Sequence, residues 1–155
     1  VLENVVLAIA ERQGIASSMF RPLSSYSEVT DEAMELLGNF ELNEDALRRI
    51  DELPYGRQRL VEIVIALGQR PSVLLLDEPA AGIPSSESQH ILDAASALSS
   101  DITVLIIEHD MEIVFSVADY ITVLVSGAVL TEGEPEVIAA DERVRAVYLG
   151  EVDRG

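Results

Sequence analysis

The fold is decided by residues 73–79, Val73-Leu74-Leu75-Leu76-Asp77-Glu78-Pro79. A run of four apolar residues has no polar face, so it predicts a strand that is buried on both sides. Two carboxylates follow the run, and a carboxylate at the end of a buried strand is costly unless a cation or hydrogen bonds compensate it. The stretch therefore indicates either a metal–phosphate site, with Asp77 facing Mg²⁺ and Glu78 facing a water molecule, or an ordinary strand followed by a solvated acidic turn.

Composition narrows the class of protein. The 155 residues suit one domain with a sizeable core, and 48% of them are hydrophobic. A net charge of −18 opposes binding to a phosphate backbone, so no nucleic-acid partner is expected. The absence of cysteine excludes disulfides and thiolate metal sites. No apolar stretch approaches the length that spans a bilayer. All ten basic residues are arginine, which matters below.

The first fifty residues predict a small helical layer. Apolar residues recur at helical spacing in 2–9, and the serine-rich stretch 17–27 predicts a loop. Thr30 is expected to cap the next helix, because acidic residues follow it in the first turn. A short turn of helix is expected over 46–50. This layer carries no recognisable chemistry of its own.

An apolar helix is predicted to follow Leu53-Pro54-Tyr55-Gly56-Arg57-Gln58 and to end near Gly68 and Pro71. A glycine at the entrance of a helix lets backbone N–H groups approach an anion, and the helix dipole favours phosphate there. The commoner interpretation of such a stretch is a capped core helix. Taken alone, the segment leaves both interpretations open.

The second half of the chain alternates strands and helices. A tight loop is expected at 80–85, a helix after Ser85 on which His90 is solvated, and a second buried strand over 103–107. Asp110 is expected to cap a further helix. A third strand is expected over 120–125 and leads into a hairpin, and a last helical stretch is expected to begin at Pro135. This order predicts a parallel sheet with right-handed crossovers, whose ligands bind beyond the carboxyl ends of the strands. If the first two strands are neighbours, Asp77, Glu78 and His109 converge on one crevice.

Four stretches in this order resemble one known family: Leu53–Gln58, Leu74–Pro79, Ala80–Ser85 and Glu108-His109-Asp110. The chain resembles the C-terminal part of the ATP-binding cassette (ABC) ATPases along its full length, with the signature motif, the Walker B strand, the D-loop and the switch histidine. The resemblance implies an α/β, P-loop NTPase-like fold: an incomplete parallel sheet with helices on both faces, a small helical subdomain, and a C-terminal β-hairpin and helix. Residues 1–52 would be the remainder of the helical subdomain, and residues 53–155 the C-terminal part of the ABC core.

Details of these stretches resemble one subclass, the ATPase subunits of branched-chain amino-acid importers. They are Tyr55 within the signature, Ala80-Ala81-Gly82 after Walker B, Ile107–Met111, and the terminal Tyr148–Glu151. The implied function is the energy-coupling subunit of such an importer. Two alternatives stay open: a non-transport ABC ATPase, and a catalytically silent interaction module derived from an ABC cassette.

The resemblance implies a role for each matching residue. Asp77 would help to hold Mg²⁺ through its water shell, Glu78 would activate the attacking water, and His109 would contact the γ-phosphate. The signature residues, Leu53, Pro54, Tyr55, Gly56, Arg57 and Gln58, would face ATP bound to a second, head-to-tail subunit. Gly82 and Pro84 would belong to the D-loop. The implied cofactors are ATP and Mg²⁺.

Three departures from the family pattern limit these expectations. The Walker A loop and the Q-loop are absent, and Walker A needs a lysine that this sequence does not contain, so this chain alone is expected to be inactive. Pro54 replaces the usual signature serine. Pro84 replaces an acidic or amide residue of the D-loop.

Partners and location follow from the same resemblance. The implied partners are transmembrane permease subunits and a second ATPase subunit, and the implied location is cytoplasmic, peripheral on the inner face of the cell membrane. The apolar surface and sheet edge that an N-terminal half would cover predict that this chain associates with itself.

Overall fold

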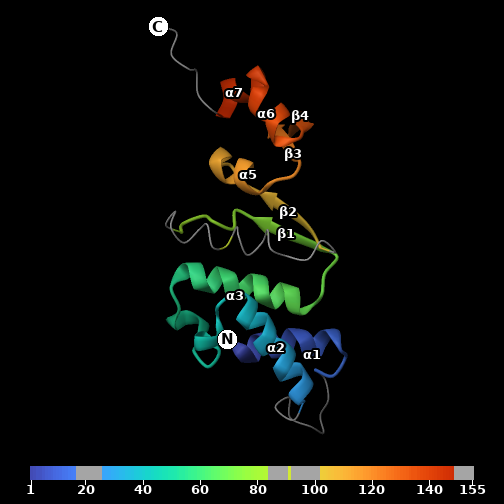
Figure 1. Cartoon of the computed structure of the whole chain (residues 1–155), viewed down its shortest axis with the longest axis vertical. Coiled ribbons are helices and arrows are strands. Elements are labelled where there is room, and N and C mark those ends of the chain that lie inside the picture. Colours follow the sequence, from blue (N-terminus) through green and yellow to red (C-terminus); the bar gives the residue numbers. More distant parts are fainter. Residues whose placement is uncertain (17–25, 84–90, 92–101, 149–155) are drawn as a thin grey trace. The chain divides into compact units, whose positions relative to one another are not determined.

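The computed structural model describes residues 1–16, 26–83, 91 and 102–148. The chain forms two compact units, Val1–Ile106 and Ile107–Gly155 (Figure 1). The predicted boundary between residues 52 and 53 falls inside the first unit, and the assignment of 1–52 as a separate subdomain stays a prediction. Residues 17–25 of the loop predicted over 17–27 lie outside the described residues, as do Pro84, His90 and the terminal stretch 149–155.

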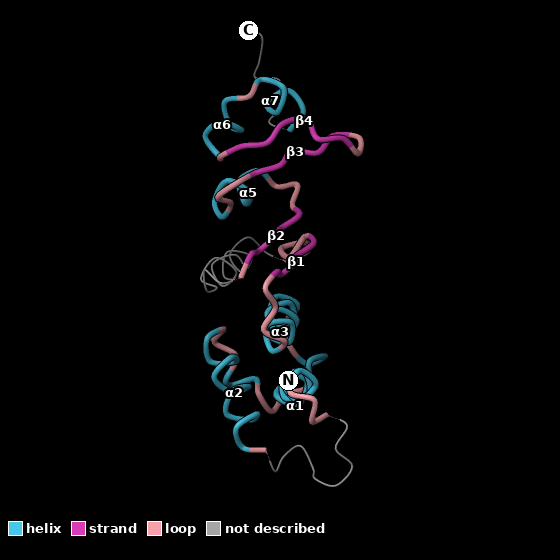
Figure 2. Tube along the Cα trace, turned by 90° about the vertical axis from the view of Figure 1, so that its right-hand side faces the viewer, coloured by secondary structure: helices cyan, strands magenta, loops and turns pink. Residues whose placement is uncertain are grey.

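Three helices build the core of the first unit: α1 (Leu2–Arg12), α2 (Ser27–Asn39) and α3 (Tyr55–Gly68) (Figures 1 and 2). Each turns an apolar stripe inward because its apolar residues recur at helical spacing. The largest side chains with essentially no exposure come from all three helices and include Val5, Ile9, Val29, Leu37, Val61 and Val64. Two short 3₁₀ turns, η2 (Asn43–Asp45) and η3 (Ile50–Glu52), connect α2 to α3. The helical layer predicted for the first fifty residues is therefore confirmed.

An ionic cluster ties the ends of these helices together. Glu32 on α2 accepts from Arg12 on α1 at 2.7 Å and from Arg70 at 2.8 Å. Arg12 also donates to the carbonyl oxygen of Gly68, the last residue of α3, at 2.9 Å. The hydrogen bond from Arg12 holds the pKa of Glu32 below its usual range; burial opposes this shift, and Arg70 adds to it.

The start of α2 differs from the prediction. The helix begins at Ser27, its N-cap residue Tyr26 makes no side-chain capping bond, and the Thr30 hydroxyl donates to the Tyr26 carbonyl at 3.3 Å. Thr30 as a cap was therefore wrong, because its hydroxyl bonds back along the helix to the residue four earlier. The short turn of helix expected over 46–50 was misplaced as well, since η2 ends before these residues and η3 begins at the last of them, Ile50.

Strands β1 (Val73–Asp77) and β2 (Thr103–Ile107) pair side by side and run parallel (Figure 1). Leu74 is buried and Leu76 packs against the helical core. On the other face, Val73 is 52%, Leu75 69% and Leu105 55% exposed. The prediction that this strand is buried on both faces was therefore wrong. An apolar run needs a layer on each side, and the described part of the first unit covers one side only.

The second unit is a hairpin with short helices: α5 (Met111–Val117), β3 (Ile121–Val125), β4 (Ala128–Gly133), α6 (Pro135–Ala140) and α7 (Glu142–Tyr148). Ser126 and Gly127 turn β3 into antiparallel β4, both with positive φ, as a tight hairpin turn requires. Its core is formed by Ile121, Val123, Ile138 and Val144. The predicted hairpin and the helix beginning at Pro135 are confirmed.

The two sheets settle the fold class. The parallel pair consists of β1 and β2, and β3 is hydrogen-bonded to β4 in a separate sheet. The predicted α/β class with a parallel element and a C-terminal hairpin is confirmed. In the described part of the chain, no helix is both long and apolar enough to cross a membrane.

Candidate functional site

The carboxyl end of β1 carries the predicted catalytic and metal-binding carboxylates. Asp77 is the last residue of the strand, Glu78 follows it, and both are exposed. Glu78 has a φ of +44°, a left-handed conformation that costs a non-glycine residue about 1–3 kcal/mol. Its carbonyl accepts from Ala81 N at 3.0 Å, and Ala80 O accepts from Ile83 N at 3.2 Å. The chain thus leaves the strand through a tight, strained loop, as predicted for its described part.

These carboxylates fit a magnesium ion held together with a nucleotide. Mg²⁺ prefers oxygen ligands and usually takes one or two protein carboxylates together with phosphate oxygens and water. Among the described residues there is no group of three or more His, Cys, Asp or Glu that could hold a metal. Asp77 is exposed at a strand end, so its oxygens can reach a hydrated ion whose other ligands come from a bound nucleotide.

The first turn of α3 carries the predicted signature residues. Leu53 and Gly56 are buried, and Pro54 is the N-cap residue, with φ −55° and ψ 149°. The first intrahelical bond runs from Gln58 N to Pro54 O at 3.1 Å, and the Gln58 side chain donates to Leu53 O at 2.8 Å. The first turn of a helix directs backbone N–H groups outward, where they can meet an anion.

Tyr55 connects this turn to the loop after β1. Its ring is stacked by the Arg59 guanidinium, whose central carbon lies 5.1 Å from the ring centroid. Gly82, with φ +73°, lies so close that a Cβ there would be 3.7 Å from Tyr55 Cε1. The structure therefore brings together two of the predicted elements, the start of α3 and the described part of the loop over 80–83.

The Arg57 side chain is hydrogen-bonded to residues that the sequence analysis did not predict as its partners. Its Nε donates to the Asp45 carboxylate, and its Nη2 donates to Glu41 O at 2.7 Å. Asp45 is 3% exposed and also accepts from Arg48 Nη1 at 3.0 Å. The guanidinium of the signature stretch is thus directed toward η2. An aspartate inside a polar, acidic connection gives no signal of such a role, and twelve residues separate it from Arg57.

His109 belongs to the second unit, so its convergence with Asp77 and Glu78 stays a prediction. Its side chain is 72% exposed, and its Nδ1 lies 4.0 Å from Glu108 Oε2, whose side chain is 3% exposed. Asp110, next along the chain, caps α5 by accepting from Glu112 N at 2.9 Å and Ile113 N at 3.5 Å. The predicted cap is confirmed, and it fixes the backbone that follows His109.

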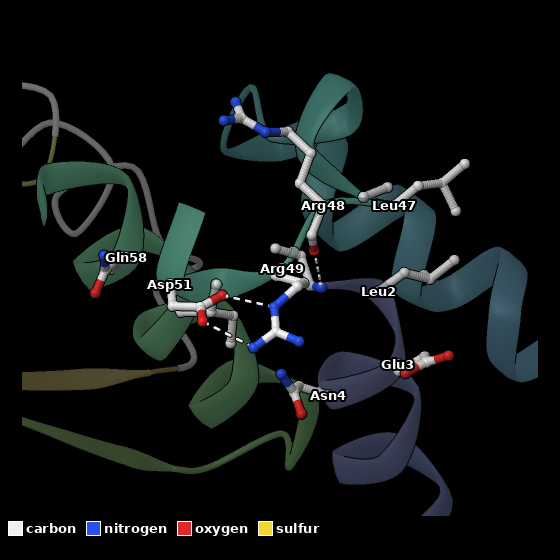
Figure 3. Close-up of a pocket in the computed structure, with 11 residues that line it drawn as sticks. Leu2, Glu3, Asn4, Leu47, Arg48, Arg49, Asp51 and Gln58 are labelled. Atoms are coloured by element: carbon white, nitrogen blue, oxygen red, sulfur yellow. Dashed lines mark hydrogen bonds and ion pairs between the residues drawn. The ribbon is translucent and has the colours of Figure 1, made fainter. Parts of the chain in front are cut away.

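A groove of about 660 Å³ lies elsewhere in the first unit (Figure 3). Its walls are residues 1–4 at the start of α1 and residues 46–51, which run from the end of η2 into η3, and Gln58 also lines it. Arg49 and Asp51 form a two-point ion pair there, at 2.9 and 2.8 Å, drawn as dashed lines in Figure 3. Gln58 is the one predicted site residue among its lining residues, so this groove is separate from the carboxylates at the end of β1.

Comparison with known proteins places these features in a family. The pattern of the family described as ABC transporter matches residues 2–81, and that described as branched-chain amino acid ATP-binding cassette transporter matches residues 128–154. BraF of Pseudomonas aeruginosa, a high-affinity branched-chain amino acid transport ATP-binding protein, is 41% identical over 129 residues, covering 82% of this chain and 51% of BraF. LivG of Escherichia coli K12, with the same description, is 36% identical over 160 aligned positions, covering 97% of this chain and 62% of LivG.

Solved structures of ATP-binding cassettes are similar to this chain as well. MJ1267, an ATP-binding cassette of an ABC transporter, superposes with a TM-score of 0.78 at 28% identity, covering 95% of this chain and 61% of that one. Its ADP conformation superposes with a TM-score of 0.73 at 30% identity, covering 94% and 63%. This chain therefore spans between about half and two thirds of the length of the relatives it matches. From the sequence motifs, the α/β fold and these matches together, the chain belongs to the ABC transporter family.

Proposed function

We propose that the complete protein is the ATP-hydrolysing, energy-coupling subunit of an ABC importer for branched-chain amino acids. The observation that carries the proposal is the match of residues 128–154 to the branched-chain pattern, together with relatives of that description over 82–97% of the chain. The exposed carboxylates at the end of β1 support the hydrolytic part. The sequence alternatives, a non-transport ATPase and a silent module, have no comparable support.

The residues of this chain take the following roles in the proposal. Asp77 would hold Mg²⁺ through its water shell, and the ion would supply charge neutralisation for the phosphates. Glu78 accepts a proton from the attacking water, and its strained backbone holds the carboxylate beyond the strand end. His109 donates toward the γ-phosphate. The first turn of α3 offers its N–H groups to the γ-phosphate of ATP bound on a second subunit. Gly82 is assigned to the D-loop between the subunits, as is Pro84, which lies outside the described residues.

A permease subunit is the proposed membrane partner, and the groove of Figure 3 is its proposed docking place. The groove lies on the helical layer, and Leu47 at its wall is 93% exposed. An exposed large apolar side chain beside arginines suits an amphipathic segment of another protein. Docking there would place the protein on the cytoplasmic face of the membrane, as a peripheral subunit.

The test is ATP turnover by the complete protein, assembled with its permease in vesicles, together with uptake of labelled leucine. Replacement of a general base lowers turnover by about 10²–10⁴-fold, so Glu78→Gln is expected to abolish both turnover and uptake while leaving ATP binding intact. Glu35→Gln, which changes an exposed carboxylate on α2, is the control and should keep both. Turnover without uptake of any branched-chain amino acid would contradict the importer assignment, and no turnover in the unsubstituted protein would favour the silent module.

A further inference from the structure

Asp45 is a buried carboxylate that contacts an arginine from each of two parts of the first unit, the start of α3 and the wall of the groove. It is 3% exposed and accepts from two guanidinium groups, those of Arg48 and Arg57. A buried charge is tolerated when it is paired and hydrogen-bonded, and removing one partner of such a group is far more disruptive than changing an exposed pair. The arrangement is therefore a firm connection between the elements that carry the two arginines.

One arginine belongs to the helix start that faces a nucleotide in the proposed function. Arg57 is the third residue of α3 and directly follows buried Gly56. Its side chain reaches back to Asp45 and to Glu41 O. These two contacts fix the rotation of the first helical turn relative to η2, because the two ends of one planar guanidinium engage different residues.

The other arginine belongs to the groove wall. Arg48 donates to Asp45 at 3.0 Å and to Glu52 O at 3.0 Å, and its carbonyl accepts from the backbone nitrogen of Val1 at 2.8 Å. Figure 3 draws this last contact as a dashed line from the carbonyl oxygen of Arg48. The segment that forms one groove wall is thus attached to the same carboxylate as the helix start.

We propose that Asp45 is a positioning residue: it sets the orientation of the first turn of α3 through Arg57 and links that orientation to the groove wall through Arg48. The proposal rests on the proposed function, in which this turn contacts the γ-phosphate in trans. A protein segment that enters the groove and moves Arg48 would then shift Arg57, and with it the backbone N–H groups that receive the phosphate. Asp45 acts through Arg57 and does not itself touch the nucleotide.

The experiment compares Asp45→Asn in two backgrounds of the complete protein, one with Arg57 and one carrying Arg57→Gln. With Arg57 present, Asp45→Asn is expected to lower kcat about tenfold or more, since small misplacements of positioning groups cost on that order. In the Arg57→Gln background the same change should lower kcat less than about twofold, because the guanidinium through which Asp45 acts on the first turn of α3 is gone, although Arg48 still contacts Asp45. Glu44→Gln, an exposed neighbour in the same 3₁₀ turn, is the matched control and should leave kcat unchanged. Equal losses in both backgrounds would show a purely structural role and overturn the proposal.

A second readout separates this proposal from the proposed function and does not need turnover. Gln58 N makes the first intrahelical bond of α3, so its hydrogen exchange reports the order of the first turn. Asp45→Asn should speed that exchange about tenfold with Arg57 present and have little effect in the Arg57→Gln background. Arg57→Lys, which keeps the charge but not the two-ended guanidinium, should speed the exchange as well, and it serves where Asp45→Asn does not fold. Unchanged exchange at Gln58 in these variants would overturn the inference about Asp45, even if the complete protein turns over ATP. If the exchange changes as expected in a protein without ATP turnover, the inference about Asp45 stands and only the proposed function is contradicted.

Discussion

The ionic cluster around Glu32 makes a pH-dependent contribution to stability that can be measured directly. Glu32 accepts from Arg12 at 2.7 Å and from Arg70 at 2.8 Å, and its side chain is 21% exposed. Glu32→Gln keeps the shape of the side chain and removes its negative charge. Arg12 is 17% exposed and Arg70 is 71% exposed, so the Arg12 contact dominates and the Arg70 contact is largely screened. A hydrogen bond to a charged group contributes about 1.5–3 kcal/mol, and we expect a loss of about 2 kcal/mol at pH 7.

The sign of the pH dependence follows from the lowered pKa of Glu32. Its ordinary value is 4.5, and the hydrogen bond from Arg12 lowers the folded-state pKa below it. A carboxyl with a depressed pKa contributes stability that is fully present above the unfolded pKa and is lost as pH falls through the folded pKa. The difference between the unsubstituted protein and Glu32→Gln should therefore be constant from neutral pH down to about pH 5 and should shrink below about pH 4.5.

The assay is urea denaturation of the complete protein at several pH values, with hydrogen exchange of the α1–α3 amides to assign the change to the first unit. Glu35→Gln changes an exposed carboxylate on the same helix and serves as the control, with no pH-dependent difference expected. A stability difference for Glu32→Gln that stays the same between pH 7 and pH 3, or one that Glu35→Gln reproduces, would refute the reasoning.

Three further predictions concern packing, capping and backbone conformation. Leu37→Ala opens a cavity at a residue with 0% exposure and should lower the free energy of unfolding by about 3 kcal/mol in urea denaturation, while Leu47→Ala at 93% exposure should change it little. Asp110→Ala removes the side-chain cap of α5 and should cost about 1 kcal/mol, with faster hydrogen exchange at the two amides it accepts from. Gly82→Ala forces a Cβ into φ +73° and should cost about 1–2 kcal/mol, whereas Gly82→Asn should cost less because asparagine tolerates that region; equal costs would contradict the explanation by backbone strain.

Local rules predicted the elements well where neighbours along the chain decide the outcome. Helical spacing located α1 and α3, the carboxylate of Asp110 capped α5, and Ser126-Gly127 gave the hairpin turn. The prediction of Thr30 as the cap failed because a threonine before acidic residues fits both an N-cap position and a position inside the helix. The helix begins four residues earlier than a cap at Thr30 would place it. Propensity cannot separate two starts of one helix that differ by a single turn.

Sequence patterns did not predict the contacts between residues that lie far apart in the chain. Nothing in residues 43–45 marks Asp45 as buried, since acidic residues in a polar connection are normally exposed. The exposed face of β1 has the same origin: four apolar residues predict layers on both sides, but whether a layer exists depends on chain that lies far away in sequence. No feature of the sequence predicts the positive φ of Glu78, because only the surrounding fold makes a glutamate adopt this conformation.

Pro54 shows how structure changes the interpretation of a departure from the family pattern. Relative to a serine, a proline lacks two groups, the hydroxyl and the backbone N–H. In the structure Pro54 is the N-cap residue, its φ of −55° suits a proline ring, and its carbonyl accepts the first helical bond from Gln58. The N–H groups that a helix start presents to an anion belong to the residues that follow, so the ring leaves those of Tyr55, Gly56 and Arg57 in place. In the proposed function the hydroxyl is then the substantial loss at this position, and the proposed role of the contact between Arg57 and Asp45 is to orient the remaining donors.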